Sequence, residues 1–581
     1  MIILGINAYH PNSSACLLIN GKIKIALEEE RINRIKSWSG LPVESINHCL
    51  KNQSIKFSDV DYIAINQDFY ANIFRKLKYL IFSRPNLSFL INNFMNKLKR
   101  KNILSLLEYE LGSAKNSCKL IGIEHHKAHI ASAYFESTYD KSVNLSVDGF
   151  GDFASVAWGL GNQEKISIDR KILFPHSLGI LYESFTQFLG FSNFGEEYKV
   201  MGLSSLGNPS QLGNIRKVIQ LKKNGEFELN LNYFSHHKKK ITYSFDNTTP
   251  KIDNLFNSNF ESLFGNPRKK EDDMNSYHRD IAASVQKIYE ETLFHILDHV
   301  NNKYKVDNLT LSGGCAQNSL ANGKILKNTD FKSLFVPANP GDGGGSVGAA
   351  YMLWSDLRGK KPSNSLGSYL GNSYNNTQIE KAITNKKKDL LFEKCKYFFI
   401  ENESSLCNFA AEELSHQKVI GWFQGSMEWG PRALGNRSII SDPRNSNIKN
   451  LLNLKIKRRE SFRPFAPSIL FEEASNWFED FVDDEPNMSR VLSFKKNKAH
   501  LIPGVVHVDG TGRLQTVKNS QNKRYYKLIN SFKKITGVPI ILNTSFNENE
   551  PVVFSPEDAI NCFLRTKMDI LIIENWVIVR N

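Results

Sequence analysis

The sequence predicts an α/β protein built from two domains. Short apolar runs rich in β-branched residues, typical of buried strands, alternate with longer amphipathic stretches of helical period. The chain has 581 residues, and single domains usually run to roughly 100–250 residues. Hydrophobic residues make up 41% of the chain and charged residues 23%, as in ordinary globular proteins.

The N-terminal segment predicts an antiparallel meander with a polar turn at residues 10–14. A similar strand–turn–strand pattern recurs around the turn at residues 148–152. This recurrence is weak evidence for an internal duplication, because the two sequences do not match. The expected strands are residues 2–6, 15–19, 22–27, 144–147 and 155–159.

Further helices and strands continue the α/β pattern to the C-terminus. Residues 219–270, rich in Asn, Lys and Ser, are expected to form an insertion or irregular loop. A domain boundary is expected within residues 363–385, which gives domains of residues 1–370 and 386–581. The expected helices are 125–135, 281–300 and 406–414, and the expected strands are 309–311, 419–424, 538–542 and 570–573.

The formal net charge of +15 raises the question of nucleic-acid binding. The positive excess is concentrated in residues 76–101, 216–240 and 268–270, and lysine-rich runs of this kind are more often solvated loops. A positive potential also attracts small anionic substrates. Nucleic acid is therefore not the expected partner.

Cysteine usage and hydropathy point to the cytoplasm. The seven cysteines are scattered and form no CxxC pair, which argues against a disulfide framework and a thiolate zinc site. The N-terminus lacks the charged and apolar regions of a signal peptide, and no stretch approaches about 18 apolar residues. No association with a membrane is expected.

His125 and His129 open a predicted helix and suggest a metal site. Residues four apart lie on one helical face, so both imidazoles can reach a single ion. Asp148 and Asp342 lie in glycine-rich turns and are candidates for further ligands. Two histidines with carboxylates suit non-haem iron(II). Alone, the histidine pair is as often a core or solvated pair, and each aspartate fits equally as a turn or cap residue.

Glycine-rich turns are candidates for holding a nucleotide. Gly313, Gly314 and Asn318 follow a predicted buried strand and precede a helix, where backbone N–H groups bind phosphates well. Gly149 and Gly151 are expected to let the backbone turn sharply and approach a ligand closely. Neither a Rossmann fingerprint nor a Walker-type loop is present, so those nucleotide folds are disfavoured.

The C-terminal half carries arginines on turns fixed by glycine or proline. Guanidinium groups match phosphate and carboxylate oxygens, so these arginines predict a small, rigid anion site. The alternative is a set of surface arginines on loops. The residues concerned are Arg432 and Arg437 in GSMEWGPRALGNRS, Arg463 before a proline, and Arg513 in GTGRLQ, with LNTSF following a strand.

Motifs along nearly the whole chain resemble the O-carbamoyltransferase family (NodU/CmcH type) that modifies nodulation factors, cephems and aminoglycosides. The matching strings are HHKAHIASAYFES, SVDGFGD, GEEYKVMGLSSLG, LSGGCAQNSLANGKI, NPGDGGGSVGAA, QGSMEWGPRALGNRSIISDPR, FRPFAP, GTGRLQTV and VPIILNTSFN. The parts that resemble the family least are residues 69–101 and 219–270, which we expect to form substrate-specific surface.

The resemblance implies a fold and an activity. The N-terminal half resembles the duplicated actin/Hsp70-like fold of the Kae-like proteins, and the C-terminal half resembles the YrdC-like fold. By this resemblance the C-terminal domain forms carbamoyl-adenylate from carbamoyl phosphate and ATP. The N-terminal domain, with iron(II) or another divalent metal, transfers the carbamoyl group to a hydroxyl of a sugar or natural product. Mg²⁺ could accompany ATP, and a homodimer is compatible with the sequence.

The resemblance also assigns roles to residues. His125, His129, Asp148 and Asp342 would hold the metal, while Arg432, Arg463, Arg513 and Asn543 would bind carbamoyl phosphate. His10 and Lys36 match the positions of acceptor and adenylate contacts more loosely, and Lys24 or Arg34 could take the place of Lys36.

Two other functions are compatible with parts of the sequence. The N-terminal half alone would suit an actin-like ATPase or sugar kinase, which would release ADP. The basic charge and Kae-like resemblance would suit a tRNA-modifying threonylcarbamoyl-type transferase, although no RNA-binding module is recognisable.

Overall fold

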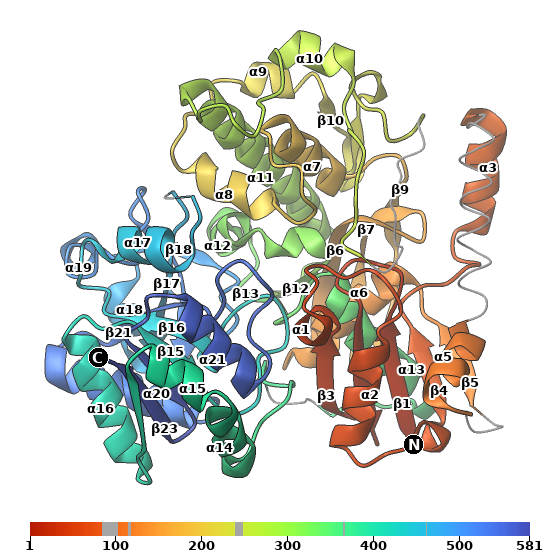
Figure 1. Ribbon diagram of the computed structural model, residues 1–581. Coiled ribbons are helices and arrows are strands. Elements are labelled where there is room, and N and C mark those ends of the chain that lie inside the picture. The colour runs from red at the N-terminus through yellow and green to blue at the C-terminus, as the bar shows by residue number, and fades with distance from the viewer. Residues whose placement is uncertain (84–102, 114–117, 239–247, 364–366, 461) are drawn as a thin grey trace. The chain divides into compact units, whose positions relative to one another are not determined.

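The computed structural model describes residues 1–83, 103–113, 118–238, 248–363, 367–460 and 462–581. The chain divides into two compact units (Figure 1). The N-terminal unit comprises Met1–Ala321 and Ile325–Ser365, and the C-terminal unit comprises Asn322–Lys324 and Leu366–Asn581.

The N-terminal unit begins with a five-stranded sheet in the order β3-β2-β1-β4-β5. Strands β1, β2 and β3 form an antiparallel meander, whereas β4 and β5 run parallel to β1. The apolar run of β1 is almost entirely buried, which explains its central place in the sheet. The strands are β1 (Ile2–Asn7), β2 (Ser14–Ile19), β3 (Lys22–Glu28), β4 (Tyr62–Ile65) and β5 (Lys119–Gly122).

A second sheet repeats this topology. Strand β6 takes the place of β1: β7 pairs with it antiparallel, β9 pairs antiparallel with β7, and β12 and then β13 extend the sheet in parallel. The same order and directions in both sheets reveal the internal duplication that the recurring turn had suggested. The strands are β6 (Lys141–Gly151), β7 (Ala154–Asn162), β8 (Lys165–Ile166), β9 (Arg170–Leu173), β12 (Asn308–Ser312) and β13 (Ser333–Phe335).

Helices α6 (His125–Glu136) and α13 (Gly345–Arg358) pack against each other in the N-terminal unit. They approach so closely that a Cβ at Gly348 would overlap the Ala128 carbonyl oxygen. Helix α6 is buried on nearly all sides, as expected for a helix between layers. The other helices of this unit are α1 (Glu30–Asn33), α2 (Val43–Asn52), α3 (Ile73–Ser83), α5 (Ile103–Leu111), α7 (Leu178–Phe188), α8 (Glu197–Ser204), α9 (Leu212–Ile215), α10 (Ser258–Phe264), α11 (Ser276–Tyr304) and α12 (Ser319–Asn328).

The C-terminal unit is built on an eight-stranded mixed sheet in the order β14-β23-β22-β15-β16-β21-β17-β20. Its core is formed by apolar side chains of the sheet and of the helices packed on it. The strands are β14 (Cys395–Phe399), β15 (Ile420–Phe423), β16 (Arg437–Ser441), β17 (Ala466–Leu470), β20 (Gln515–Val517), β21 (Ile540–Ser545), β22 (Ile570–Ile573) and β23 (Trp576–Arg580).

A two-stranded sheet and several helices complete the C-terminal unit. The sheet pairs β18 (Val491–Ser493) antiparallel with β19 (Thr511–Arg513). The helices are α14 (Asn376–Asn385), α15 (Lys387–Phe392), α16 (Glu403–Ser415), α17 (Ile448–Leu451), α18 (Ala474–Trp477), α19 (Lys496–Ala499), α20 (Lys523–Thr536) and α21 (Pro556–Arg565). The predicted α/β class, with a duplicated N-terminal domain followed by a second α/β domain, is confirmed, while the actin-like and YrdC-like assignments stay predictions.

Two segments are more regular than predicted. Part of the expected linker is helix α14, whose start is fixed by reciprocal hydrogen bonds between Asn375 and Gln378. The expected irregular insertion contains β10 (Ile219–Leu221), β11 (Phe227–Leu229) and α10. These elements were not predicted because both segments are polar in composition. Short elements need only a few apolar residues to pack against a large core. Residues 84–102 and 239–247 of the less family-like segments lie outside the described residues.

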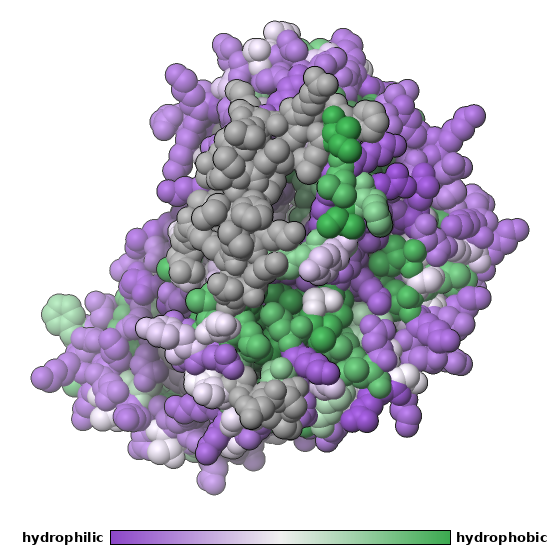
Figure 2. Space-filling model, turned by 90° about the vertical axis from the view of Figure 1, so that its right-hand side faces the viewer, coloured by the Kyte–Doolittle hydropathy of each residue, from purple (hydrophilic) through white to green (hydrophobic). Residues whose placement is uncertain are grey.

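Figure 2 shows one side of the molecule, where a mainly hydrophilic surface is interrupted by apolar areas. Exposed apolar side chains among the described residues include Phe74, Leu77 and Ile81 of α3. Within the described part of the chain, no helix has the length and apolar character needed to cross a bilayer.

Candidate functional site

Helix α6 positions the first two candidate ligands. The Glu124 carboxylate accepts the Lys127 N–H at 2.9 Å and caps the helix. His125 and His129, one turn apart, are fully buried, and their Nε2 atoms face each other at 3.0 Å. Two neutral nitrogens with facing lone pairs would repel, so a proton or a cation belongs between them.

Two carboxylates complete the cluster. Asp148 Oδ2, on β6, lies 3.1 Å from His125 Nε2 and 3.6 Å from His129 Nε2. Asp342 Oδ1, just before α13, lies 3.5 and 3.4 Å from the same atoms. The four candidate ligand atoms all lie within 4.8 Å of one another. These four residues come from three separate segments of the chain, and the structure brings them together.

The electrostatics of the cluster reflect its excess of negative charge. Burial lowers the pKa of His129, but the hydrogen bonds and charges of Asp148 and Asp342 outweigh it and raise the pKa to about 10. Burial raises the pKa of Asp148, but hydrogen bonds from both histidines bring it well below its usual range. The site therefore favours positive charge at its centre.

Close packing, rather than a sharp turn, explains one glycine of the VDGFGD motif. Strand β6 continues through Gly151, and the chain reverses at Asp152 and Phe153, which have positive φ. The predicted turn at Gly149 and Gly151 is therefore wrong. A Cβ at Gly151 would overlap the His125 ring, whereas a Cβ at Gly149 would meet nothing within 4 Å. Asp152 Oδ2 accepts the His125 N–H at 3.0 Å and holds the start of α6.

The SGG turn lies directly beside this cluster. Gly314 N–H donates to Asp148 Oδ1 at 2.7 Å. Gly313 has a φ of +87°, and a Cβ there would overlap the Val147 carbonyl oxygen. Asn318 caps α12 and exchanges hydrogen bonds of 3.0 and 2.9 Å with the Gln286 amide. Its side chain is thus held by protein groups.

His10 and Lys36 have different surroundings. The His10 ring stacks on the His125 ring with centroids 5.1 Å apart, which places His10 against the candidate metal cluster. Lys36 lies in the exposed loop after α1, where its carbonyl accepts the Thr249 hydroxyl at 2.7 Å. The assignment of Lys36 remains a prediction.

A cluster of arginines forms the second candidate site, in the C-terminal unit. Burial lowers the pKa of Arg513 well below its usual range, and three more guanidinium groups lower it further, those of Arg432, Arg459 and Arg463. Arg513 Nε is also buried without a hydrogen-bond partner. A buried cation surrounded by like charges would be relieved by a bound anion.

Arg459 is a member of this cluster that the motif analysis missed. Its Nε donates to Asn453 Oδ1 at 2.7 Å, and its guanidinium lies 4.7 Å from the centre of the Phe465 ring. Its position four residues before Arg463 was the signal in the sequence that could have identified it. Asn543, on β21, donates through Nδ2 to the Ala433 carbonyl, next to Arg432, while its Oδ1 is buried without a partner.

Arg437, by contrast, is a structural residue. Its side chain is fully buried and donates to the carbonyls of Gln424, Asn436, Asn372 and Gly425 at 2.6–3.1 Å. It also lies 3.6 Å from the centre of the Phe423 ring. The Nη1 and Nη2 groups of Arg437 already have carbonyl acceptors within the fold, whereas its Nε is buried without one. These contacts argue against the prediction that Arg437 contributes to the anion site.

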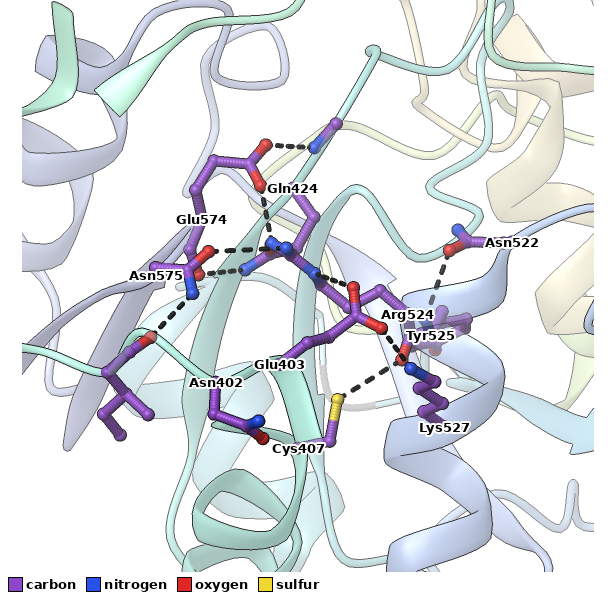
Figure 3. A network of polar contacts seen from close by, with 12 residues as sticks. Asn402, Glu403, Cys407, Gln424, Asn522, Arg524, Tyr525, Lys527, Glu574 and Asn575 are labelled. Carbon is purple, nitrogen blue, oxygen red and sulfur yellow. Dashed lines mark hydrogen bonds and ion pairs between the residues drawn. The ribbon is translucent and has the colours of Figure 1, made fainter. Parts of the chain in front are cut away.

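The loop that carries Arg432, residues 425–436, is held at several points. Glu428 Oε1 accepts the backbone N–H groups of Leu434, Asn436 and Arg437 at 2.8–3.0 Å. Figure 3 shows the network at the start of the loop. There Arg524 donates to Gln424 and Glu574 at 2.5 and 2.6 Å, and Glu574 accepts the Gly425 N–H. Such anchoring pre-organises a binding loop.

Comparisons with known proteins identify the family of the chain. Residues 2–351 match the family described as Carbamoyltransferase N-terminus, and residues 411–580 match Carbamoyltransferase C-terminus. An uncharacterized protein of Synechocystis sp. is 36% identical over 100% of this chain and 96% of its own length. Nodulation protein NolNO of Sinorhizobium fredii is 35% identical over 98% of this chain and 79% of its own length.

Among solved structures, T. kodakarensis HypF aligns with 62% of this chain and 48% of its own, at 16% identity and a TM-score of 0.32. That likeness is too slight to support a comparison of sites. The two matches to family domains cover both units, and together with the full-length relatives they lead to one conclusion: the chain belongs to the carbamoyltransferase family and is a carbamoyltransferase.

Proposed function

We propose that this enzyme is an O-carbamoyltransferase that works in two steps. The C-terminal unit would form carbamoyl-adenylate from carbamoyl phosphate and ATP. The N-terminal unit would transfer the carbamoyl group to a hydroxyl of a small-molecule acceptor, such as a sugar or natural product. The observation that carries the proposal is the convergence of His125, His129, Asp148 and Asp342 within 4.8 Å in a chain of this family.

The cluster fits a divalent cation. Asp342 Oδ1 is shielded from solvent, and the imidazole nitrogens beside it lie 3.5 and 3.4 Å away, longer than a good hydrogen bond, so a cation would satisfy it. Two imidazoles and two carboxylates suit iron(II), and other divalent ions bind similar sets. When bound, such an ion would polarise a phosphate or carbonyl oxygen as a Lewis acid.

In the first step the arginines would bind the phosphate of carbamoyl phosphate. Water would cleave it to carbamate and phosphate, and a carbamate oxygen would then attack the α-phosphorus of ATP as pyrophosphate leaves. Arg432, Arg463 and Arg513 support this role because positive charge in a shielded site stabilises the charge on transferring phosphoryl groups. Mg²⁺ bound to ATP is compatible with this step.

In the second step the acceptor hydroxyl would attack the carbonyl carbon of the adenylate, and AMP would leave. The hydroxyl proton needs a base, and His10 is the candidate because its ring packs on His125. The N–H groups of Gly313 and Gly314 already donate to the Pro340 carbonyl and to Asp148 Oδ1, both at 2.7 Å, so these glycines would serve the adenylate by letting it approach the backbone closely. The role of Lys36, a homodimer and a cytoplasmic location remain predictions.

The test uses the full chain with ATP, carbamoyl phosphate and iron(II), followed by mass detection of carbamoyl-adenylate. Arg432→Ala should abolish this intermediate. His129→Ala should still form it but fail to carbamoylate any member of a panel of sugars that the parent enzyme modifies. Arg458→Ala and Lys127→Ala are matched controls, since both residues are near these sites in sequence but point to solvent or to surface partners.

The nucleotide product distinguishes the alternatives. Transfer through an adenylate releases AMP and pyrophosphate, whereas an actin-like kinase or ATPase would release ADP. Release of ADP alone, or equal behaviour of the two variants and the parent, would show that the proposed division of steps is wrong.

A further inference from the structure

The hairpin at residues 507–513 holds a histidine that the proposed function does not use. His507 N–H donates to the Thr511 carbonyl at 2.7 Å, and Gly510 N–H donates to the His507 carbonyl at 3.0 Å. Gly510 has a φ of +80°, which permits this tight reversal. The hairpin leads directly into β19 and Arg513.

A chain of hydrogen bonds determines the tautomer of His507. The Thr511 hydroxyl donates its one proton to Asp509 Oδ1 at 2.7 Å. Its oxygen can therefore only accept from His507 Nδ1, which lies 3.1 Å away. Nδ1 carries the ring proton, and Nε2 carries a lone pair. Nε2 is shielded from solvent and has no hydrogen-bond partner.

Thr511, the partner of His507, lies on the side of the hairpin that carries Arg513. Side chains alternate along a strand, so Thr511 and Arg513 share one face of β19. A Cβ at Gly512 would overlap the Phe494 ring, so the opposite face is packed into the core. The His507 ring is bonded to Thr511 on this face, and the positive charge of Arg513 acts on it.

The charges around His507 keep it a neutral base. Burial lowers its pKa to about 4; the negative charge of Asp509 opposes this, while the positive charges of Arg513 and of Lys449 on α17 add to it. An anion bound at the arginines would offset those positive charges. The basicity of His507 would then rise when carbamoyl phosphate is bound.

We propose that His507 Nε2 is the general base that accepts a proton from the water that cleaves carbamoyl phosphate. The water oxygen bonds to the carbonyl carbon, the bond from that carbon to the bridging oxygen breaks, and the second water proton ends on the phosphate, so carbamate and hydrogen phosphate leave. The proton passes to Nε2 and then to solvent, so charge and atoms balance. The inference rests on the proposed function and assigns a base to its first step.

The central experiment follows phosphate release from carbamoyl phosphate by the full-length enzyme. Removing a general base typically costs 10²–10⁴-fold, so His507→Gln should release phosphate at least about 100-fold more slowly than the parent. Binding of carbamoyl phosphate should change by less than about twofold, since the arginines supply the affinity. His500→Gln is the matched control because His500 is an exposed histidine seven residues earlier.

A bypass separates the proton-transfer role from damage to the site. Ammonium bicarbonate solutions contain carbamate, the product of the cleavage step assigned to His507. Added carbamate therefore enters the reaction after that step. With carbamate and ATP, His507→Gln should release pyrophosphate at the parent rate. His507→Ala should regain phosphate release when imidazole is added, which a merely structural role would not allow.

Thr511→Val provides a second variant in case His507→Gln does not fold. It removes the acceptor of the Nδ1 proton, so phosphate release should fall about 10-fold at unchanged binding, less than on removal of the base itself. If a folded variant released phosphate at the parent rate, the inference would be overturned. It would also be overturned if the variant lost both carbamoyl-phosphate binding and phosphate release. Formation of carbamoyl-adenylate by the parent enzyme would leave the proposed function intact in either case. If the parent itself formed none, the proposed function would fail.

Discussion

At the scale of single residues, the space beside His125 depends on the absence of a side chain at Gly151. A Cβ at this position would overlap the ring, whereas Gly149, two residues earlier on β6, has open space. A ring displaced by even a fraction of an ångström changes the distances among four ligand atoms that lie within 4.8 Å. Geometry at this site is therefore sensitive to a single methyl group.

We expect Gly151→Ala to lower affinity for divalent metal at least about 10-fold, the scale of changes seen when ligand orientation is lost. Gly149→Ala should keep its metal content. Metal stoichiometry of the purified proteins, measured by elemental analysis after titration with iron(II), checks both. Equal metal binding by the two variants would contradict the packing argument.

Glu136, the last residue of α6, connects pH with stability. Burial raises the pKa of its carboxyl from 4.5 to about 8, and a negative charge at a helix C-terminus is unfavourable as well. The folded state prefers the protonated acid, so its contribution to stability is fully present below about pH 4.5. That contribution is lost as the pH rises toward 8.

The free energy of unfolding of the parent should therefore fall relative to that of Glu136→Gln between pH 4.5 and 8, by a few kcal/mol, because one pKa unit corresponds to about 1.4 kcal/mol. Urea denaturation at several pH values measures this difference. Glu110→Gln, on exposed α5, should track the parent throughout. A constant gap between parent and Glu136→Gln would show that the carboxyl is solvated.

At the scale of elements, the loop of residues 425–436 is ordered by one carboxylate. Glu428→Ala would leave the buried N–H groups of Leu434, Asn436 and Arg437 without their acceptor. An unsatisfied buried donor costs about 1–3 kcal/mol. We expect destabilisation of at least about 2 kcal/mol in urea denaturation, together with weaker binding of carbamoyl phosphate. Glu428→Gln, which keeps a carbonyl acceptor, should lie between Ala and parent in both measurements.

The helices and strands also show which parts of the fold the sequence patterns predicted correctly. Buried β-branched runs predicted the central strands β1, β2, β12 and β22 to within two residues. Helix α14 was missed because its exposed face is polar, although the Asn375–Gln378 cap was readable from the sequence. The reversal after Asp148 was placed too early, because Gly151 allows packing against His125 and the chain reverses only at Asp152 and Phe153.

At the scale of the whole molecule, two units with separate candidate sites predict separate responses to ligands. A ligand present at 100 times its dissociation constant stabilises its binding unit by about 2.7 kcal/mol. Carbamoyl phosphate should slow hydrogen exchange in residues 366–581, and iron(II) should slow it in residues 1–365. His129→Ala should abolish only the effect of iron(II), and Arg432→Ala only that of carbamoyl phosphate. Protection of the opposite unit by either ligand would refute this assignment.

The sequence by itself determined the α/β class, the family and most of the residues named at both candidate sites, because motifs preserve chemistry and local order along the chain. Only the tertiary structure decided which of those residues meet. It joined Asp342 to His125 across 217 positions, added Arg459, and turned Arg437 inward to backbone carbonyls. It also revealed the lone pair of His507. Burial, hydrogen-bond partners and close contacts arise from packing among distant segments, and no local pattern records them.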